Sequence, residues 1–334
     1  MRICLMVEGQ EDVAWEQWVA LARACEEHGL EGLFRSDHYL SVSGRLERGS
    51  LDAWATLSAL GSITSRLRLG TLVSPATFRH PSVLAKTVVT VDHVTGGRVE
   101  LGMGAGWLTL EHRAYGFPYP APGVRISMLE EQVEIVHGLW SDDGFSFDGE
   151  HYRLDEVHAL PKPVQRPHPP LIIGGDAGPR SARLAARWAD EYNVLSSTPD
   201  ECRTMRARVA EAWEREGRDP ATLRFSLMTG VVVGRDRDEV RERARRVIRR
   251  SNEDAEPDAW LAQNPSLVAG TTDQVIARLG ELEDAGVDRV MLQHSTTATS
   301  TWWSSSVARS LPPWPDRRQS QTVTTTVAMR IPIS

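Results

Sequence analysis

Short apolar segments alternate with helical patterns along most of this chain, and the alternation limits the folds open to it. After each segment, apolar residues recur three or four positions apart, as on one face of a helix. Strands that are separated by helices pair in parallel. Eight such segments occur, at residues 3–7, 32–36, 67–73, 98–102, 171–174, 191–195, 225–233 and 287–293. The pattern predicts an α/β fold, the (β/α)8 TIM barrel.

The alternation pauses between the fourth and fifth segments. Phe145, Phe147 and Tyr152 alternate around Asp148-Gly149, which indicates a surface hairpin, and five prolines between 161 and 170 indicate a stiff connection. We therefore expect residues 141–170 to be an excursion from a barrel that occupies residues 1–294. Residues 295–334 are rich in Ser and Thr and show no helical period where an eighth outer helix would belong. We expect this tail to be poorly ordered.

The composition limits the partners and the compartment. The net charge of −7 argues against a nucleic-acid surface, which needs a basic stripe. No apolar run approaches the roughly 18 residues that cross a bilayer, and Glu8 interrupts the apolar N-terminus too early for a signal peptide. The three cysteines form no CxxC pair, as is typical of proteins in a reducing cytosol. We expect a cytoplasmic protein that binds neither nucleic acid nor membrane.

Asp37 and His38 directly follow the second apolar segment. In a barrel of parallel strands, side chains at the C-terminal ends of the strands face the active site. An acid and an imidazole at such a place predict a catalytic role, because imidazole titrates near neutral pH. The alternative is that both residues only cap the following turn.

The fourth segment leads into Gly102-Met103-Gly104-Ala105-Gly106-Trp107. Glycines let a ligand approach the backbone closely. We interpret Gly104 and Gly106 as making room for a flat ring on which Trp107 can stack. The alternative is that Trp107 packs beneath the excursion. Glu111 and His112 follow on the same loop and are candidates to support the site.

The fifth segment runs into a glycine-rich turn that opens a helix at Pro179. Such a turn exposes unpaired amides and the positive end of the helix dipole, which favours an anion. We predict that it binds phosphate, with added charge from Arg180 and Arg183. Asp176 counts against an anion unless its carboxylate caps the helix. The residues assigned to the turn are Gly174, Gly175, Asp176, Ala177 and Gly178.

Other polar residues carry weaker signals. Arg79 and His80, after the third segment, either meet a substrate or cap the helix that follows. Glu130 and Glu131 lie inside a predicted helix and are expected to face solvent. The ten histidines show no spacing typical of metal ligands, so we predict no metal site.

Several of these segments, in order along the chain, resemble the luciferase-like monooxygenase superfamily, and within it the branch that uses the deazaflavin coenzyme F420. They extend over residues 1 to about 293. The similar pieces are Leu33-Phe34-Arg35-Ser36-Asp37-His38, residues 69–73, Arg79-His80-Pro81, residues 101–107, Ile173-Gly174-Gly175, Gly270-Thr271 and residues 286–290.

The resemblance implies coenzyme F420, or FMN as the alternative, bound across the mouth of the barrel with its ring near Asp37 and His38. Members of the family often carry a non-proline cis peptide at the end of the third strand, where it forms a bulge against the ring. In this chain Leu72-Val73 or Val73-Ser74 would take that place.

The resemblance also places the phosphate of the cofactor near Gly174 and Gly175. The chain departs from the sugar-phosphate dehydrogenases of this branch, which have a catalytic Glu where this chain has Trp107. That difference counts against a sugar phosphate as the substrate.

The resemblance implies hydride transfer between the coenzyme and a small organic substrate. His38 would donate or accept the proton, and Asp37 would hydrogen-bond the cofactor or orient His38. Two alternatives stay open: an FMN-dependent monooxygenase served by a flavin reductase, and a barrel that binds a flavin without catalysis. We also expect a homodimer.

Overall fold

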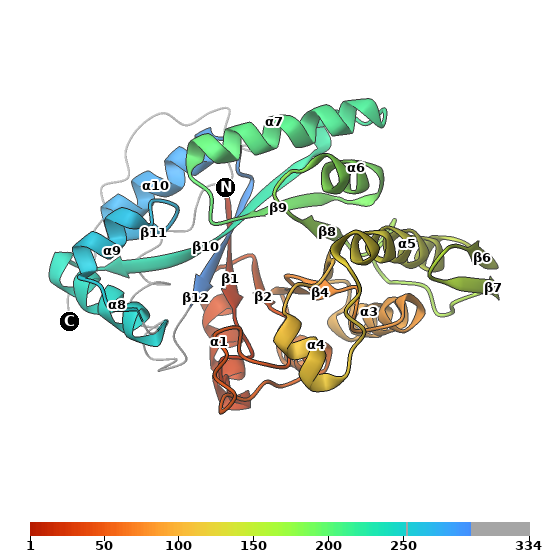
Figure 1. Cartoon of the computed structure of the whole chain (residues 1–334), viewed down its shortest axis with the longest axis horizontal. Helices are drawn as coiled ribbons and strands as arrows, with labels where there is room; N and C mark the ends of the chain where they lie inside the picture. The colour runs from red at the N-terminus through yellow and green to blue at the C-terminus, as the bar shows by residue number, and fades with distance from the viewer. Residues whose placement is uncertain (252, 295–334) are drawn as a thin grey trace.

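A closed ring of parallel strands forms the centre of the molecule (Figure 1). The computed structural model describes residues 1–251 and 253–294. Each ring strand pairs with the next, and the ring closes through the pairs β9–β10, β10–β12 and β12–β1. The ring strands of this part of the chain are β1 (Arg2–Val7), β2 (Gly32–Arg35), β3 (Arg68–Thr71), β5 (Val99–Gly104), β8 (Leu171–Gly174), β9 (Glu191–Leu195), β10 (Arg224–Gly234) and β12 (Arg289–His294). The predicted TIM barrel is confirmed.

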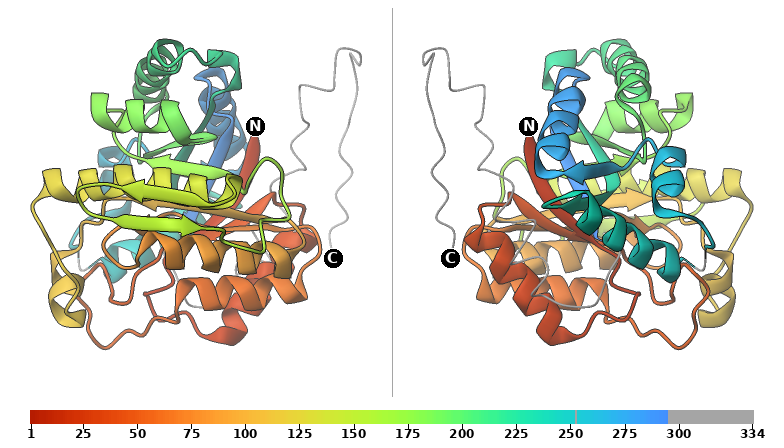
Figure 2. Two further views of the ribbon diagram at one scale, coloured as in Figure 1. Left: turned by 90° about the vertical axis from the view of Figure 1, so that its right-hand side faces the viewer. Right: turned by 90° about the vertical axis from the view of Figure 1, so that its left-hand side faces the viewer.

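Helices cover the outside of the ring, as Figure 2 shows in two side views. Local sequence explains where several of them begin or end. The Asp52 carboxylate accepts the N–H of Ala55, Thr198 and Glu201 form a capping box, and Gly96 ends a helix with a φ of 63°. The long helices among the described residues are α1 (Trp15–Glu27), α2 (Ala53–Ile63), α3 (Pro81–Thr95), α5 (Pro122–Ser141), α6 (Pro179–Trp188), α7 (Pro199–Arg215), α8 (Arg237–Arg250) and α10 (Thr272–Asp284).

Short elements were missed by the sequence analysis because they hold too few residues to show a period. The predicted loop after β5 contains α4 (Thr109–Tyr115), so the assignment of Glu111 and His112 to a loop is wrong. The others are β4 (Ser74–Pro75), the 3-10 turn η1 (Pro220–Thr222), α9 (Pro257–Gln263) and β11 (Val268–Thr271). β11 pairs with the last residues of β10, outside the ring.

A hairpin of β6 (Phe145–Asp148) and β7 (Arg153–Val157) follows α5 in the chain, before β8. Glu131 on α5 accepts the backbone N–H groups of Glu150, His151 and Tyr152, which ties the hairpin to that helix. The prediction that Glu131 only faces solvent is therefore wrong. The predicted tail, 295–334, lies outside the described residues.

The interior of the barrel is filled below the C-terminal ends of its strands. At the N-terminal end, which we call the base, the Arg289 guanidinium lies between the carboxylates of Glu100 and Glu191. An apolar cluster stands above it, made of Cys4, Met6, Phe34, Leu72, Ile172 and Met291. A larger apolar core lies between the strands and the helices. The opposite end, which we call the mouth, is where side chains can meet a ligand.

Two kinds of feature are absent from the residues that the structure describes. None of their helices combines the length and the apolar composition needed to cross a bilayer. They also contain no cluster of three or more His, Cys, Asp or Glu side chains placed to hold a metal ion.

Candidate active site

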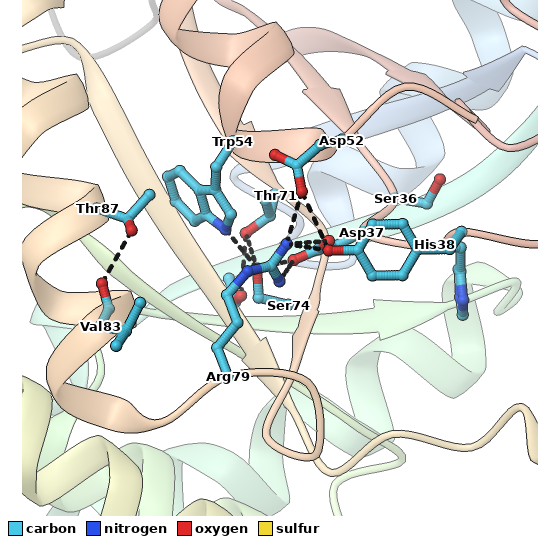
Figure 3. A network of polar contacts seen from close by, with 12 residues as sticks. Ser36, Asp37, His38, Asp52, Trp54, Thr71, Ser74, Arg79, Val83 and Thr87 are labelled. Carbon is cyan, nitrogen blue, oxygen red and sulfur yellow. Dashed lines mark hydrogen bonds and ion pairs between the residues drawn. The ribbon is translucent and has the colours of Figure 1, made fainter. Parts of the chain in front are cut away.

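Asp37 lies at the mouth, buried in a polar network (Figure 3). Arg79 donates to both of its oxygens, at 2.6 and 3.1 Å, and the Ser74 hydroxyl donates to Oδ2 at 2.6 Å. Arg79 also reaches Asp52, at 3.1 Å, and the Tyr39 hydroxyl, at 2.9 Å. Burial alone would lower the pKa of Arg79, but the adjacent Asp37 carboxylate raises it above its usual value. Arg79 therefore stays a cation, and it fixes the position of Asp37.

Arg79 and its partner Asp37 are 42 residues apart in the chain, too far for local sequence patterns to pair them. Of the two roles considered for Arg79 and His80, the structure gives the capping role to His80, whose ring accepts the N–H of Ser82 at the start of α3. The interpretation that Asp37 orients His38 is wrong, because the hydrogen bonds of Asp37 go to Arg79 and Ser74.

His38 is oriented instead by Glu111 from α4. Its Nδ1 lies 2.7 Å from Oε2 of Glu111, whose side chain has no exposed surface. The other Glu111 oxygen accepts the backbone N–H groups of Tyr39 and Leu40. Burial lowers the pKa of His38, but the hydrogen bond and charge of Glu111 outweigh it and leave that pKa raised. Within the described chain no group hydrogen-bonds Nε2 of His38, so this nitrogen can meet a ligand.

Trp107 stands beside His38 at the mouth. The two rings are edge to face, with centroids 5.8 Å apart and planes at 81°. Trp107 is 60% exposed, so the alternative in which it packs beneath the excursion is wrong. A flat ligand can therefore reach the indole, as the sequence analysis expected of this residue.

The segment between β3 and β4 forms a bulge into the mouth. The Leu72-Val73 peptide is cis, as the resemblance implied for this bond or the next. The methyl groups of Val73 lie over the glycines of the neighbouring strands: a Cβ on Gly104 would stand 2.6 Å from one methyl, and a Cβ on Gly174 would stand 3.7 Å from the other. Gly104 therefore makes room for Val73, which corrects the interpretation that its space is left for a ligand.

Gly106 has a similar internal role. Its φ of 79° is one that glycine adopts readily, and a Cβ there would lie 2.8 Å from the Thr77 hydroxyl. That hydroxyl lies 2.6 Å from Nε2 of His112, and Nδ1 of His112 lies 2.8 Å from the carbonyl of Leu108. Gly106 and His112 thus hold α4 and the loop after β5 in place.

The turn between β8 and α6 is tied to the Tyr192 hydroxyl. Ala177 donates its N–H to that oxygen at 2.9 Å, and the Ser181 hydroxyl lies 2.8 Å from it. Gly175 donates its N–H to the carbonyl of Asn193. Two amides that were expected to meet an anion are therefore engaged inside the protein, while the turn still lies at the mouth, beside Val73.

Charged residues around this turn differ from the prediction. Asp176 is exposed and does not cap α6, because the N-cap residue is Gly178 and no side chain caps it. Arg180 forms two hydrogen bonds with Glu130, at 2.5 and 2.7 Å, so its charge is neutralised. Glu130 is therefore a partner of Arg180 and not merely a solvent-facing residue. Of the two predicted cations, only Arg183 remains exposed at this turn without a recorded partner in the described chain.

The candidate residues form a chain of contacts around the mouth. Trp107 contacts His38, Asp37 contacts Ser74, and Val73 lies against Gly104 and Gly174. Sequence analysis missed Glu8, which directly follows β1 and accepts hydrogen bonds from Gln10 and Gln293. The rule that strand ends face the active site would have found it.

A model of the luciferase-like monooxygenase family matches residues 3–289. The chain belongs to the luciferase-like monooxygenase family. F420-dependent glucose-6-phosphate dehydrogenase of Nakamurella multipartita is 32% identical over 259 residues, which are 76% of this chain and 71% of that protein. FMNH₂-dependent dimethylsulfone monooxygenase of Pseudomonas putida is 31% identical over 202 residues, 60% of this chain and 53% of that protein.

A solved structure of similar fold is that of an F420-dependent secondary alcohol dehydrogenase in complex with an F420–acetone adduct. It matches with a TM-score of 0.78 and 21% identity, over 94% of this chain and 99% of that one. At this identity the match supports the barrel fold. The named relatives in this luciferase-like family include dehydrogenases and monooxygenases, so its members are oxidoreductases of more than one kind.

Proposed function

We propose that this protein is an F420-dependent oxidoreductase that transfers a hydride between the deazaflavin coenzyme and a small organic substrate. The observation that carries the proposal is Nε2 of His38, which lies at the mouth of the barrel beside Trp107 and has no hydrogen-bond partner among the described residues. Relatives named as F420-dependent dehydrogenases, such as that of Nakamurella multipartita, support the choice of coenzyme.

The residues at the mouth fit such a group. The Val73 bulge lies over glycines on β5 and β8, Trp107 offers an exposed aromatic face, and the turn before α6 lies within reach of the same bulge. We assign the ring to Asp37, Leu72, Val73, Ser74 and Trp107. We assign the phosphate to the turn from Gly174 to Gly178, through backbone amides other than those of Gly175 and Ala177, which are engaged inside the protein. When bound, the coenzyme supplies the hydride chemistry, and the protein supplies positioning and electrostatics.

His38 moves the proton. When a substrate alcohol loses its carbon-bound hydrogen as hydride, its hydroxyl proton passes to Nε2 of His38, and the product is a carbonyl compound. The imidazolium formed is paired through Nδ1 with the buried Glu111 carboxylate, which stabilises its charge. In the reverse direction Nε2 donates the same proton to the carbonyl oxygen.

An FMN-dependent monooxygenase is the second candidate, because the relative in Pseudomonas putida uses FMNH₂. That activity would need reduced flavin from a separate flavin reductase, and molecular oxygen as the co-substrate. The same mouth residues would hold FMN.

Titration of the purified protein with F420 and with FMN separates these candidates. We expect F420 to bind more tightly, with a change in its absorbance spectrum, and to be reduced without oxygen when a panel of alcohols is added. Tighter binding of FMN together with oxygen-dependent turnover would overturn the proposal in favour of the monooxygenase. Binding of either group without turnover on any substrate would favour a non-catalytic flavin-binding barrel.

A further inference from the structure

His38 follows β2 and Glu111 lies on α4, 73 residues apart in the chain, yet they meet in a buried contact of 2.7 Å. The short helix α4 presents the Glu111 carboxylate to the segment that follows β2. His38, Tyr39 and Leu40 all hydrogen-bond that one carboxylate. Glu111 thus joins α4 to the segment after β2 and contacts the ring proposed to move the proton.

We propose that Glu111 is a positioning residue that sets the tautomer and the proton affinity of His38. The proposal deepens the proposed function, since it concerns the residue assigned to proton transfer. Glu111 itself need not contact the substrate or the coenzyme, because it acts through the far side of the imidazole ring.

Hydrogen-bonding capacity determines the tautomer. Backbone N–H groups can only donate, so Oε1 of Glu111 must accept from Tyr39 and Leu40. An ionised carboxylate has no proton to donate, so Oε2 must also accept, and Nδ1 of His38 must carry a proton. In the neutral ring the lone pair is then on Nε2, the nitrogen that is open to a ligand. Glu111 therefore presents His38 as a proton acceptor.

The surrounding charges make this nitrogen a stronger base. The carboxylates of Glu111 on α4, of Glu8 after β1 and of Asp37 after β2 each raise the pKa of His38. Glu8 is hydrogen-bonded by Gln10 and Gln293, and Asp37 by Arg79 and Ser74. Of the three, only Glu111 hydrogen-bonds the imidazole. Burial would otherwise lower the pKa of His38, and Glu111 contributes most to raising it.

Replacement of Glu111 by Gln should reverse the tautomer. The backbone N–H groups of Tyr39 and Leu40 still require an acceptor, so the amide oxygen of the new residue stays with them. Its NH₂ group then faces Nδ1 of His38, which must accept, and the ring proton moves to Nε2. The open nitrogen of the neutral ring becomes a donor. The carboxylate charge is lost as well.

The test uses the protein without coenzyme and ¹⁵N NMR of labelled histidine, which distinguishes a protonated ring nitrogen from an unprotonated one. In the unaltered protein, neutral His38 should carry its proton on Nδ1 and titrate above its ordinary pKa. In Glu111→Gln the proton should be found on Nε2, and the pKa should fall by about 1–3 units. Neutral His38 protonated on Nε2 in the unaltered protein would overturn the proposal without any variant.

Glu11→Gln is the matched control. Glu11 is also a buried carboxylate that fixes the segment after β2, where it accepts from the Ser41 hydroxyl and the Val42 N–H. It makes no recorded hydrogen bond to His38. We expect Glu11→Gln to leave the tautomer and the pKa of His38 unchanged. An equal change in both variants would show that Glu111 acts only by holding the loop, which would contradict the proposal.

Glu111→Asp provides a second variant that keeps the charge and shortens the side chain by one methylene. Its His38 should titrate between the values of the unaltered protein and of Glu111→Gln. The pH profile of kcat/KM for alcohol oxidation should move with the NMR pKa across this series.

If F420 and FMN both fail to bind, the proposed function is lost while the tautomer result stands. If the coenzyme binds but the tautomer is unchanged in Glu111→Gln, the positioning role fails alone.

Discussion

The base and the mouth of the barrel both bury charged groups, but they use them differently. At the base, Arg289, Glu100 and Glu191 are each at most 2% exposed, and Arg289 hydrogen-bonds both carboxylates at 2.5 to 3.3 Å. At the mouth, Asp37 is paired with Arg79 in a similar way. His38, however, has one nitrogen engaged by Glu111 and, among the described residues, no hydrogen-bond partner for the other.

This difference agrees with a division in which the base stabilises the fold and the mouth has the proposed catalytic role. Buried charges are tolerated where each has a partner of opposite sign and its hydrogen bonds are made. The base meets that condition without any ligand. The mouth leaves an imidazole nitrogen open and an indole exposed, and these are the groups that a ligand would cover.

Arg289→Met should have the largest effect, on folding. The change leaves the Glu100 and Glu191 carboxylates in the barrel interior without the cation between them, and it should lower the free energy of unfolding by about 3–5 kcal/mol. Urea unfolding measures it. Arg241→Met, which removes a partly exposed pair with Asp258, is the control and should lose much less stability, because solvent screens such a pair. Equal losses would contradict the role given to the base.

His38→Asn should have a comparable effect, on turnover and not on folding. Loss of the proposed proton acceptor should lower kcat by roughly 10²–10⁴-fold, while coenzyme binding and the free energy of unfolding change little. Steady-state kinetics and urea unfolding of the same preparation measure both. His158→Asn, in the segment after β7, is the control for a general effect of losing a histidine. Unchanged turnover in His38→Asn would remove His38 from the mechanism.

Glu100→Gln and Glu191→Gln should show that the two carboxylates of the base contribute differently to stability. Burial alone would raise the pKa of Glu100, but the positive charges of Arg289 and Arg68 have the larger effect and lower that pKa to about 2. For Glu191 burial prevails over Arg289, and its pKa is raised. Ionised Glu100 therefore stabilises the fold above its unfolded pKa of 4.5, and this stabilisation is lost as the pH falls toward 2. Ionisation of Glu191 has the opposite effect on the free energy of unfolding, because its raised pKa means that stability falls as the pH rises and this group ionises.

Near neutral pH, Glu100→Gln should therefore lower the free energy of unfolding by on the order of 2–3 kcal/mol, and Glu191→Gln by clearly less. Urea unfolding between pH 4 and pH 8 measures the free energy of unfolding of both variants. Glu100→Gln should also weaken the dependence of stability on acid pH. A larger loss in Glu191→Gln would reverse the order and contradict the account of the base.

Trp107→Ala should have the smallest effect. Loss of an exposed aromatic contact should weaken coenzyme binding by roughly 2- to 10-fold, because such contacts contribute about 0.5–1.5 kcal/mol. Fluorescence titration measures it. Trp15→Ala, on α1 and 37% exposed, removes a tryptophan away from the mouth and should leave coenzyme binding unchanged. A loss of binding in both variants would point to a general effect on the protein.

Local patterns were enough to predict the ring strands and the helices after them, because burial and helical periodicity are properties of neighbouring residues. They also placed Asp37, His38 and Trp107 at the mouth, since strand direction alone puts these positions there. The patterns failed where the partner was distant: Arg180 was assigned to an anion but pairs with Glu130, and Asp37 was considered for orienting His38 but pairs with Arg79.

The amino-acid sequence by itself thus determined the barrel fold and the positions of the polar residues that follow its strands. Only the tertiary structure decided that Glu111 on α4 meets His38, that Val73 occupies the space above Gly104, and that Arg289 joins Glu100 to Glu191. The reason is physical. The secondary structure of a residue follows largely from its neighbours in the chain. The hydrogen-bond partner of its side chain depends instead on which atoms folding brings within about 3 Å of it.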